Sequence, residues 1–145
     1  MKSFREYISE DTDLGKKIVK ATKKDNDSYK ILDNHPKTEG STWAAGGCGI
    51  LAHALHKHLS GSRIVDIHNH RTGNTEHVAV QHGEHIYDSD GKHPVKNFIN
   101  KYKKLENIKD DLEMRPHDPD KTKKSGIVID KGLIDKTYEH LKGKL

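Results

Sequence analysis

The chain has 145 residues, the usual size of one domain, so we expect a single core and one main site. Its formal net charge of +4 permits contact with nucleic acid, but lysine, aspartate and glutamate are mixed along most of the sequence, which is typical of a solvated surface. The single cysteine excludes an internal disulfide, and no apolar run reaches the ~20 residues that a membrane-spanning helix needs, so we expect no membrane partner.

The first ten residues form a short amphipathic segment, in which Phe4 and Ile8 lie at helical spacing. The Met-Lys start and the aromatic-acidic-aromatic run resemble the capsid-targeting leaders of internal head proteins in T-even-type phages. The resemblance implies that a prohead protease cuts after an (Ile or Leu)-x-Glu triplet, which here ends at Glu10. Residues 1–10 would then be a removable leader, and residues 11–145 would be packed in the phage head and enter the host cytoplasm with the DNA.

Hydrophobic periodicity and turn residues predict a mixed set of elements along the rest of the chain. In chain order, we expect helices at 13–24, 29–33 and 48–59, strands at 63–68, 75–81 and 84–88, and helices at 96–112 and 133–141. The helix at 48–59 has the strongest pattern, and the last two strands are spaced as a β-hairpin. The sequence therefore predicts an α+β domain in which this central helix packs on a small antiparallel sheet, with flanking helices.

Cys48 falls in the first turn of the central helix, directly after two glycines that allow a sharp backbone bend. The partial positive charge at a helix N-terminus favours a thiolate over a thiol, and the free N–H groups there can stabilise an oxyanion. A free cysteine is also commonly a small buried residue on an apolar face, so the position alone leaves both interpretations open.

A cysteine nucleophile needs a base and a group that orients the base, and the predicted hairpin offers both. If His82 and Gly83 are the central residues of its turn, His77 lies directly opposite Asp88. If the turn is one residue later, Asp90 takes that place. We favour Asp88, because a residue followed by glycine is the commoner two-residue turn. The prediction is a catalytic set of Cys48, His77 and Asp88.

These segments resemble the papain-like peptidases, especially the bacteriocin-processing ones in which glycine follows the cysteine. The resemblance covers residues 42–91 and has the family's order of cysteine, histidine and aspartate. It implies a papain-like fold for residues 11–145 and hydrolysis of a peptide bond or a side-chain amide in a host protein.

One position departs from that family, which usually places a glutamine of the oxyanion hole six residues before the cysteine. Here the position is Thr42. Either Thr42, Ser41 or a backbone N–H such as that of Gly47 replaces the glutamine, or the site is weak, or it is not catalytic. Trp43 either forms a wall of the substrate cleft or packs in the core.

Other patterns point to simpler roles. His53 and His56, like His68 and His70, have spacings that can place two imidazoles on a metal, but no second cysteine or metalloprotease pattern accompanies them, so we expect neither metal nor cofactor. The second hypothesis for the whole chain is a non-catalytic internal head protein that binds DNA weakly inside the capsid or inhibits a host defence nuclease.

Overall fold

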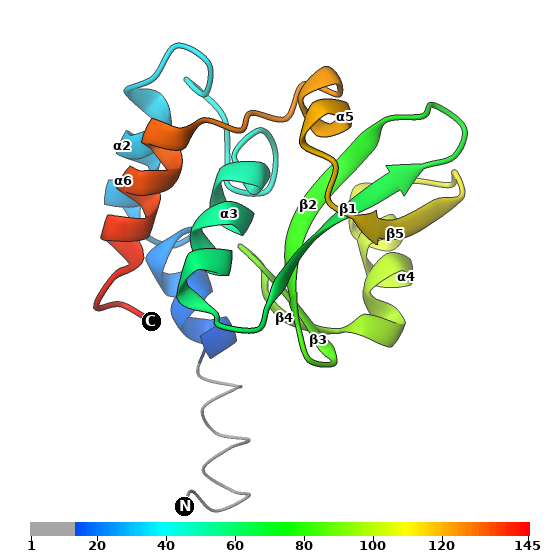
Figure 1. Cartoon of the computed structure of the whole chain (residues 1–145), viewed down its shortest axis with the longest axis horizontal. Helices are drawn as coiled ribbons and strands as arrows, with labels where there is room; N and C mark the ends of the chain where they lie inside the picture. The colour runs from blue at the N-terminus through cyan, green and yellow to red at the C-terminus, as the bar shows by residue number, and fades with distance from the viewer. Residues whose placement is uncertain (1–13) are drawn as a thin grey trace, which may run out of the picture.

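The computed structural model describes residues 14–145, and Figure 1 traces the chain through them. The predicted leader and its cleavage residue Glu10 lie outside the described residues, so both stay predictions. The described part forms an α+β fold, as expected, in which a five-stranded antiparallel sheet lies between helices. None of the helices within residues 14–145 is long and apolar enough to cross a bilayer.

The helices on one side of the sheet lie close to their predicted positions. Residues 14–21 are helical, and they are joined there by α2 (Asn26–Asp33), α3 (Cys48–His58) and α6 (Lys131–Leu141). α2 begins three residues earlier than predicted because Asp25 caps it, accepting a hydrogen bond from the N–H of Asp27. α6 packs against both α2 and α3 (Figure 1).

The sheet has the strand order β4-β3-β2-β1-β5. Its strands are β1 (Arg63–Asn69), β2 (Thr75–His82), β3 (His85–Asp88), β4 (Gly91–Pro94) and β5 (Leu112–Pro116), and the remaining helices are α4 (Val95–Glu106) and α5 (Pro119–Lys124). The three predicted strands are confirmed, whereas β4 and β5 were not predicted. The helix predicted at 96–112 is too long, because α4 ends at Glu106 and its C-cap, Asn107, has a left-handed φ of 53°.

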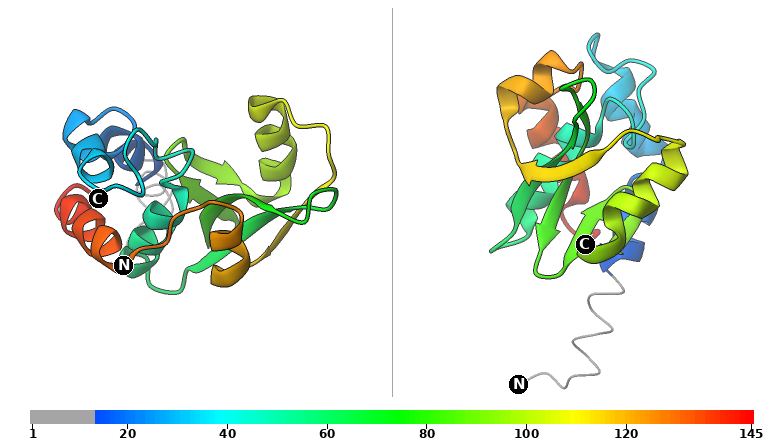
Figure 2. Two further views of the ribbon diagram at one scale, coloured as in Figure 1. Left: turned by 90° about the horizontal axis from the view of Figure 1, so that it is seen from above. Right: turned by 90° about the vertical axis from the view of Figure 1, so that its right-hand side faces the viewer.

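Alternating residues give the sheet two apolar faces. Val78 and Val80 belong to the core that contains α3, while Ala79 and Ile86 cluster with Phe98 of α4. The expected packing of the central helix on the sheet is present, and α4 covers the opposite face. Figure 2 shows the sheet between these two layers.

The β2–β3 hairpin turns one residue later than predicted. His82 pairs with His85, so Gly83 and Glu84 are the central residues of the turn, and the predicted turn at His82 and Gly83 is wrong. The φ of Gly83 is +62°, which suits the hairpin turn in which glycine stands first. The register of the hairpin is shifted accordingly.

Candidate functional site

The three residues predicted to be catalytic lie on neighbouring elements. Cys48 is the first residue of α3, His77 lies on β2, and Asp88 is the last residue of β3. α3 packs on β2, and β2 pairs with β3. All three residues are buried, with 3%, 3% and 6% of their surfaces exposed. The fold thus brings them into one region of the interior.

Two glycines shape the turn that precedes Cys48. Gly46 has a φ of +88°, and a Cβ atom there would lie 2.6 Å from the Ser41 hydroxyl oxygen. A Cβ on Gly47 would lie 2.8 Å from the carbonyl oxygen of Thr42. Larger residues would push this loop away from the start of α3, so the glycines hold Cys48 at the helix terminus.

His77 and Asp88 form a buried pair, with Nε2 of His77 3.0 Å from Oδ2 of Asp88. The observed register, continued past its last pair, puts Asp90 opposite His77 and Asp88 opposite Ala79. His77 and Ala79 point to the same face of the sheet, so Asp88 is a diagonal neighbour within reach of the imidazole. The predicted contact is therefore present although the predicted turn is wrong.

Asp88 accepts hydrogen bonds from three donors. Besides His77, the Nε2 of His93 lies 2.9 Å from Oδ1 of Asp88, and the N–H of Asp90 donates to the same oxygen over 2.9 Å. Burial alone would raise the pKa of Asp88, but the bonds from His77 and His93 outweigh burial and hold this pKa below its ordinary value. Asp88 is therefore a carboxylate at neutral pH.

The other ring nitrogen of His77, Nδ1, is left for the cysteine. It is buried and completes no hydrogen bond within the described residues. Cys48 is nevertheless close enough to interact with the ring. Burial lowers the pKa of His77, but Asp88 and Cys48 together outweigh burial and raise it to about 10. His77 can thus stand as an imidazolium between a carboxylate and the sulfur.

Cys48 borders a hollow of about 470 Å³ despite its low exposure. Ala44 and Tyr102 form part of the wall, and the charged residues that line it are Glu76 and Glu106. The ring of Tyr102 also stacks on that of His77, with centroids 5.0 Å apart. A small or extended substrate could therefore approach the sulfur in an acidic environment.

The residues predicted to complete the oxyanion hole make other contacts. The hydroxyl of Thr42 accepts a hydrogen bond from the N–H of Ala45 over 3.0 Å, and the N–H of Gly47 donates to the carbonyl of Thr42 over 2.9 Å. Both groups are engaged within the loop. Among residues 14–145, no side chain caps the N-terminus of α3.

Trp43 lies in the core and does not form a wall of the hollow. Its side chain is 1% exposed, and its indole N–H donates to the hydroxyl of Ser28 over 2.9 Å. Of the two roles considered for Trp43, both observations favour the core role.

Sequence reasoning missed His93 and Lys101. His93 lies on β4, is 3% exposed, and its Nδ1 is 3.0 Å from Nζ of Lys101 on α4. Ile86 pairs with His93 across the β3–β4 hairpin. The glycine that follows Asp90 was the available signal for this second hairpin, which places His93 next to Asp88.

A second chain of polar contacts joins other elements. Oδ1 of Asp66 lies 2.7 Å from Nδ1 of His117, and Nε2 of His117 lies 3.0 Å from Nε2 of His53. Asp66 also accepts a bond from the hydroxyl of Thr122. Burial, followed by His117, lowers the pKa of His53 to about 4. Over residues 14–145, no group of three or more histidine, cysteine or acidic residues has a metal-binding arrangement.

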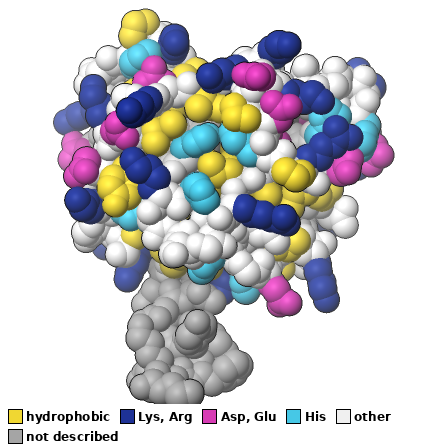
Figure 3. Space-filling model, in the orientation of Figure 1, with side chains coloured by type: hydrophobic (Ala, Val, Ile, Leu, Met, Phe, Trp, Pro, Cys, Tyr) yellow, Lys and Arg dark blue, Asp and Glu magenta, His cyan; other side chains and the backbone are white. Residues whose placement is uncertain are grey.

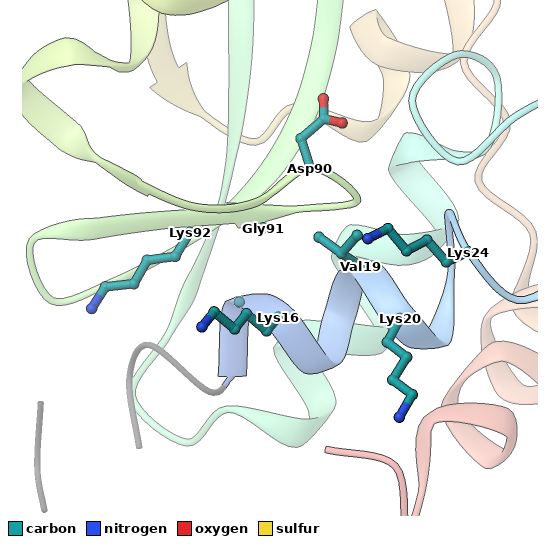
Figure 4. Close-up of a pocket in the computed structure, with 8 residues that line it drawn as sticks. Lys16, Val19, Lys20, Lys24, Asp90, Gly91 and Lys92 are labelled. Atoms are coloured by element: carbon teal, nitrogen blue, oxygen red, sulfur yellow. The ribbon is translucent and has the colours of Figure 1, made fainter. Parts of the chain in front are cut away.

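Lysines line a groove between the first described helix, with the turn that follows it, and the start of β4. Lys16, Lys20, Lys24 and Lys92 line a hollow of about 870 Å³, shown in Figure 4. Lys23 beside it is paired with Asp90 over 2.8 Å. On the face shown in Figure 3, by contrast, basic and acidic side chains are interspersed, as the sequence predicts.

Comparisons with known proteins place the chain in a family. No curated protein and no solved structure matches it. The model of the family described as Phage YunG-like protein matches residues 21–124, which is more than half of the chain and includes Cys48, His77 and Asp88. The chain therefore belongs to the Phage YunG-like protein family and is a phage-associated protein.

Proposed function

We propose that the protein is a cysteine hydrolase of papain-like design that cleaves a peptide bond or a side-chain amide in a host protein. One observation carries the proposal: His77 binds the Asp88 carboxylate through one ring nitrogen and interacts with the Cys48 side chain. The arrangement of parts supports it further, since the nucleophile begins a helix that packs on the strand bearing the base.

In the first half of the reaction, the Cys48 thiolate attacks the amide carbon, and a C–S bond forms. The first-turn N–H groups of α3, those of Cys48 and Gly49, stabilise the oxyanion because no side chain caps this terminus. The His77 imidazolium then gives its Nδ1 proton to the leaving nitrogen, and the C–N bond breaks. The products are a thioester on Cys48 and a released amine or ammonia.

In the second half, neutral His77 takes a proton from water through Nδ1. The resulting hydroxide attacks the thioester, the C–S bond breaks, and the thiolate–imidazolium pair is restored with a carboxylic acid as product. Asp88 stays ionised throughout and keeps the Nε2–H of His77 directed at itself.

The test is product formation in an extract of the host cell. The full chain and its Cys48→Ala variant are incubated with the extract, and mass spectrometry compares new protein N-termini and side-chain amides converted to carboxylates. Products that appear only with the unmodified chain support hydrolysis and separate a peptidase from a deamidase. Identical product sets with both proteins would reject the proposal.

We also propose that residues 1–10 are a packaging leader removed after Glu10. The support is the resemblance of this segment to capsid-targeting leaders, together with membership of a phage family. N-terminal analysis of the protein from purified virions is expected to begin at Asp11. Recovery of Met1 from virions would reject the leader.

A second candidate function is weak DNA binding in the capsid, and the lysine groove favours it. Lys16 and Lys20 lie four residues apart on the helix at 14–21, and Lys24 lines the same groove from the turn that follows the helix. Binding of duplex DNA that weakens steeply with salt, and that is lost in a triple lysine-to-glutamine variant of these positions but retained in Lys136→Gln, would support this function. No binding at low salt would remove it.

A further inference from the structure

The carboxylate of Asp88 has a second imidazole partner, which binds the oxygen that His77 does not bind. His93 donates to Oδ1 of Asp88 over 2.9 Å, while His77 occupies Oδ2 over 3.0 Å. Both histidines are 3% exposed, and Asp88 is 6% exposed. Each carboxylate oxygen is thus held by one buried ring.

The contact with Lys101 identifies the tautomer of His93. An ammonium group has only donors, so the Nζ of Lys101 must donate to Nδ1 of His93 over their 3.0 Å separation. Nδ1 then carries the lone pair, and the proton of the neutral ring lies on Nε2. That proton points at Asp88, which as a carboxylate has only acceptors.

The chain of contacts therefore has one direction of donation, from Lys101 through His93 to Asp88. Without the ammonium, the neutral His93 ring could place its proton on Nδ1 instead. The lone pair on Nε2 would then face Oδ1 of Asp88 and repel it. A displaced carboxylate would no longer fix the orientation of the His77 ring.

We infer that His93 and Lys101 are positioning residues of the Cys48 site, which hold the Asp88 carboxylate, and through it His77, in the orientation that serves the sulfur. The inference rests on the proposed hydrolase function and adds two residues to its machinery. Lys101 comes from α4, so this helix contributes to the site through His93 as well as covering the sheet.

The first test reads the tautomer directly by nitrogen-15 NMR of the histidine rings at pH 7. In the unmodified chain, His93 is expected to carry its proton on Nε2 and none on Nδ1. Lys101→Met keeps most of the side-chain stem but removes the donor, so Nδ1 of His93 is expected to gain a proton in part of the molecules. Lys104→Met, at another exposed position of the same helix, is the control and should leave the spectrum unchanged. A wild-type ring protonated on Nδ1 would overturn the inference.

The second test is the rate at which iodoacetamide alkylates Cys48, measured by intact mass. Lys101→Met and His93→Leu are expected to slow the reaction roughly 10-fold or more, the usual effect of losing a partner that orients a site residue. His93→Gln should recover most of the rate, because its amide N–H replaces that of Nε2. A purely structural role would lower the unfolding temperature without this rescue.

The alkylation rates distinguish a failure of the hydrolase proposal from a failure of the positioning role. A wild-type rate equal to that of a free thiol would reject the hydrolase and with it the positioning role. A fast rate that requires His77 but is the same in Lys101→Met, His93→Leu and Lys104→Met would reject the positioning role alone.

Discussion

Replacing Asp88 with asparagine should change the pH dependence of stability in a way that can be calculated. The pKa of His77 is raised from 6.5 to about 10, so the folded ring keeps a proton that the unfolded ring loses. The stabilisation is complete below pH 6.5 and is lost as the pH rises through about 10. From pH 7 to pH 9, His77 alone should lower the free energy of unfolding by about 2–3 kcal/mol.

Asp88 provides the largest of the effects that raise the pKa of His77. Most of the fall in the free energy of unfolding between pH 7 and pH 9 should therefore vanish in Asp88→Asn. The assay is urea unfolding of both proteins at several pH values between 7 and 9. Asp135→Asn is the control, because Asp135 pairs with Lys57 at an exposed position. Asp88→Asn should also lower stability at pH 7 by about 3–5 kcal/mol, since it breaks a buried ion pair.

Equal slopes of unfolding free energy against pH in the wild type and Asp88→Asn would refute the reasoning. If the asparagine variant is too unstable to fold, His77→Gln serves the same test, because it removes the titrating ring itself. The Asp88 carboxylate leads to a second expectation, at low pH. The pKa of Asp88 is lowered on folding, so its contribution to the free energy of unfolding is present above pH 3.8 and is lost as the pH falls further.

Two further predictions follow from the surroundings of Cys48. Iodoacetate should alkylate Cys48 about fivefold more slowly than iodoacetamide, after each rate is corrected for the rate of the same reagent with free cysteine. The reason is that Glu76 and Glu106 line the hollow and repel an anion by about 1 kcal/mol. Equal corrected rates would contradict an acidic environment around the sulfur. Trp43→Phe should lower the free energy of unfolding, measured with urea, by about 1–3 kcal/mol, because it leaves the buried hydroxyl of Ser28 without its indole donor. An unchanged free energy of unfolding would argue against a core role for Trp43.

Local patterns were sufficient to predict the central parts of the fold. The apolar spacing after Cys48 predicted α3, and the strand patterns predicted β1, β2 and β3 within a few residues of their observed ends. Asp88 was the right partner for His77 because opposite and diagonal positions share one face of the sheet. A turn error of one residue at Gly83 therefore did not change the identity of the carboxylate.

Features that depend on distant partners could not be predicted. β4 is only four residues long and ends in a proline, and β5 is defined by pairing with β1 across more than forty residues of chain. His93 becomes part of the site only because β4 folds back beside β3. Lys101 could not be identified either, since nothing in the local sequence indicates that its ammonium reaches a buried imidazole.

The central claim is that the His77 ring activates the sulfur of Cys48, and the rate of its alkylation by iodoacetamide at pH 7 tests this most directly. The chain has one cysteine, so the modification has one location. We predict a rate well above that of a free thiol in the wild type and in the hairpin control His85→Ala, and a loss of this excess in His77→Ala. A wild-type rate no faster than that of His77→Ala would contradict the account.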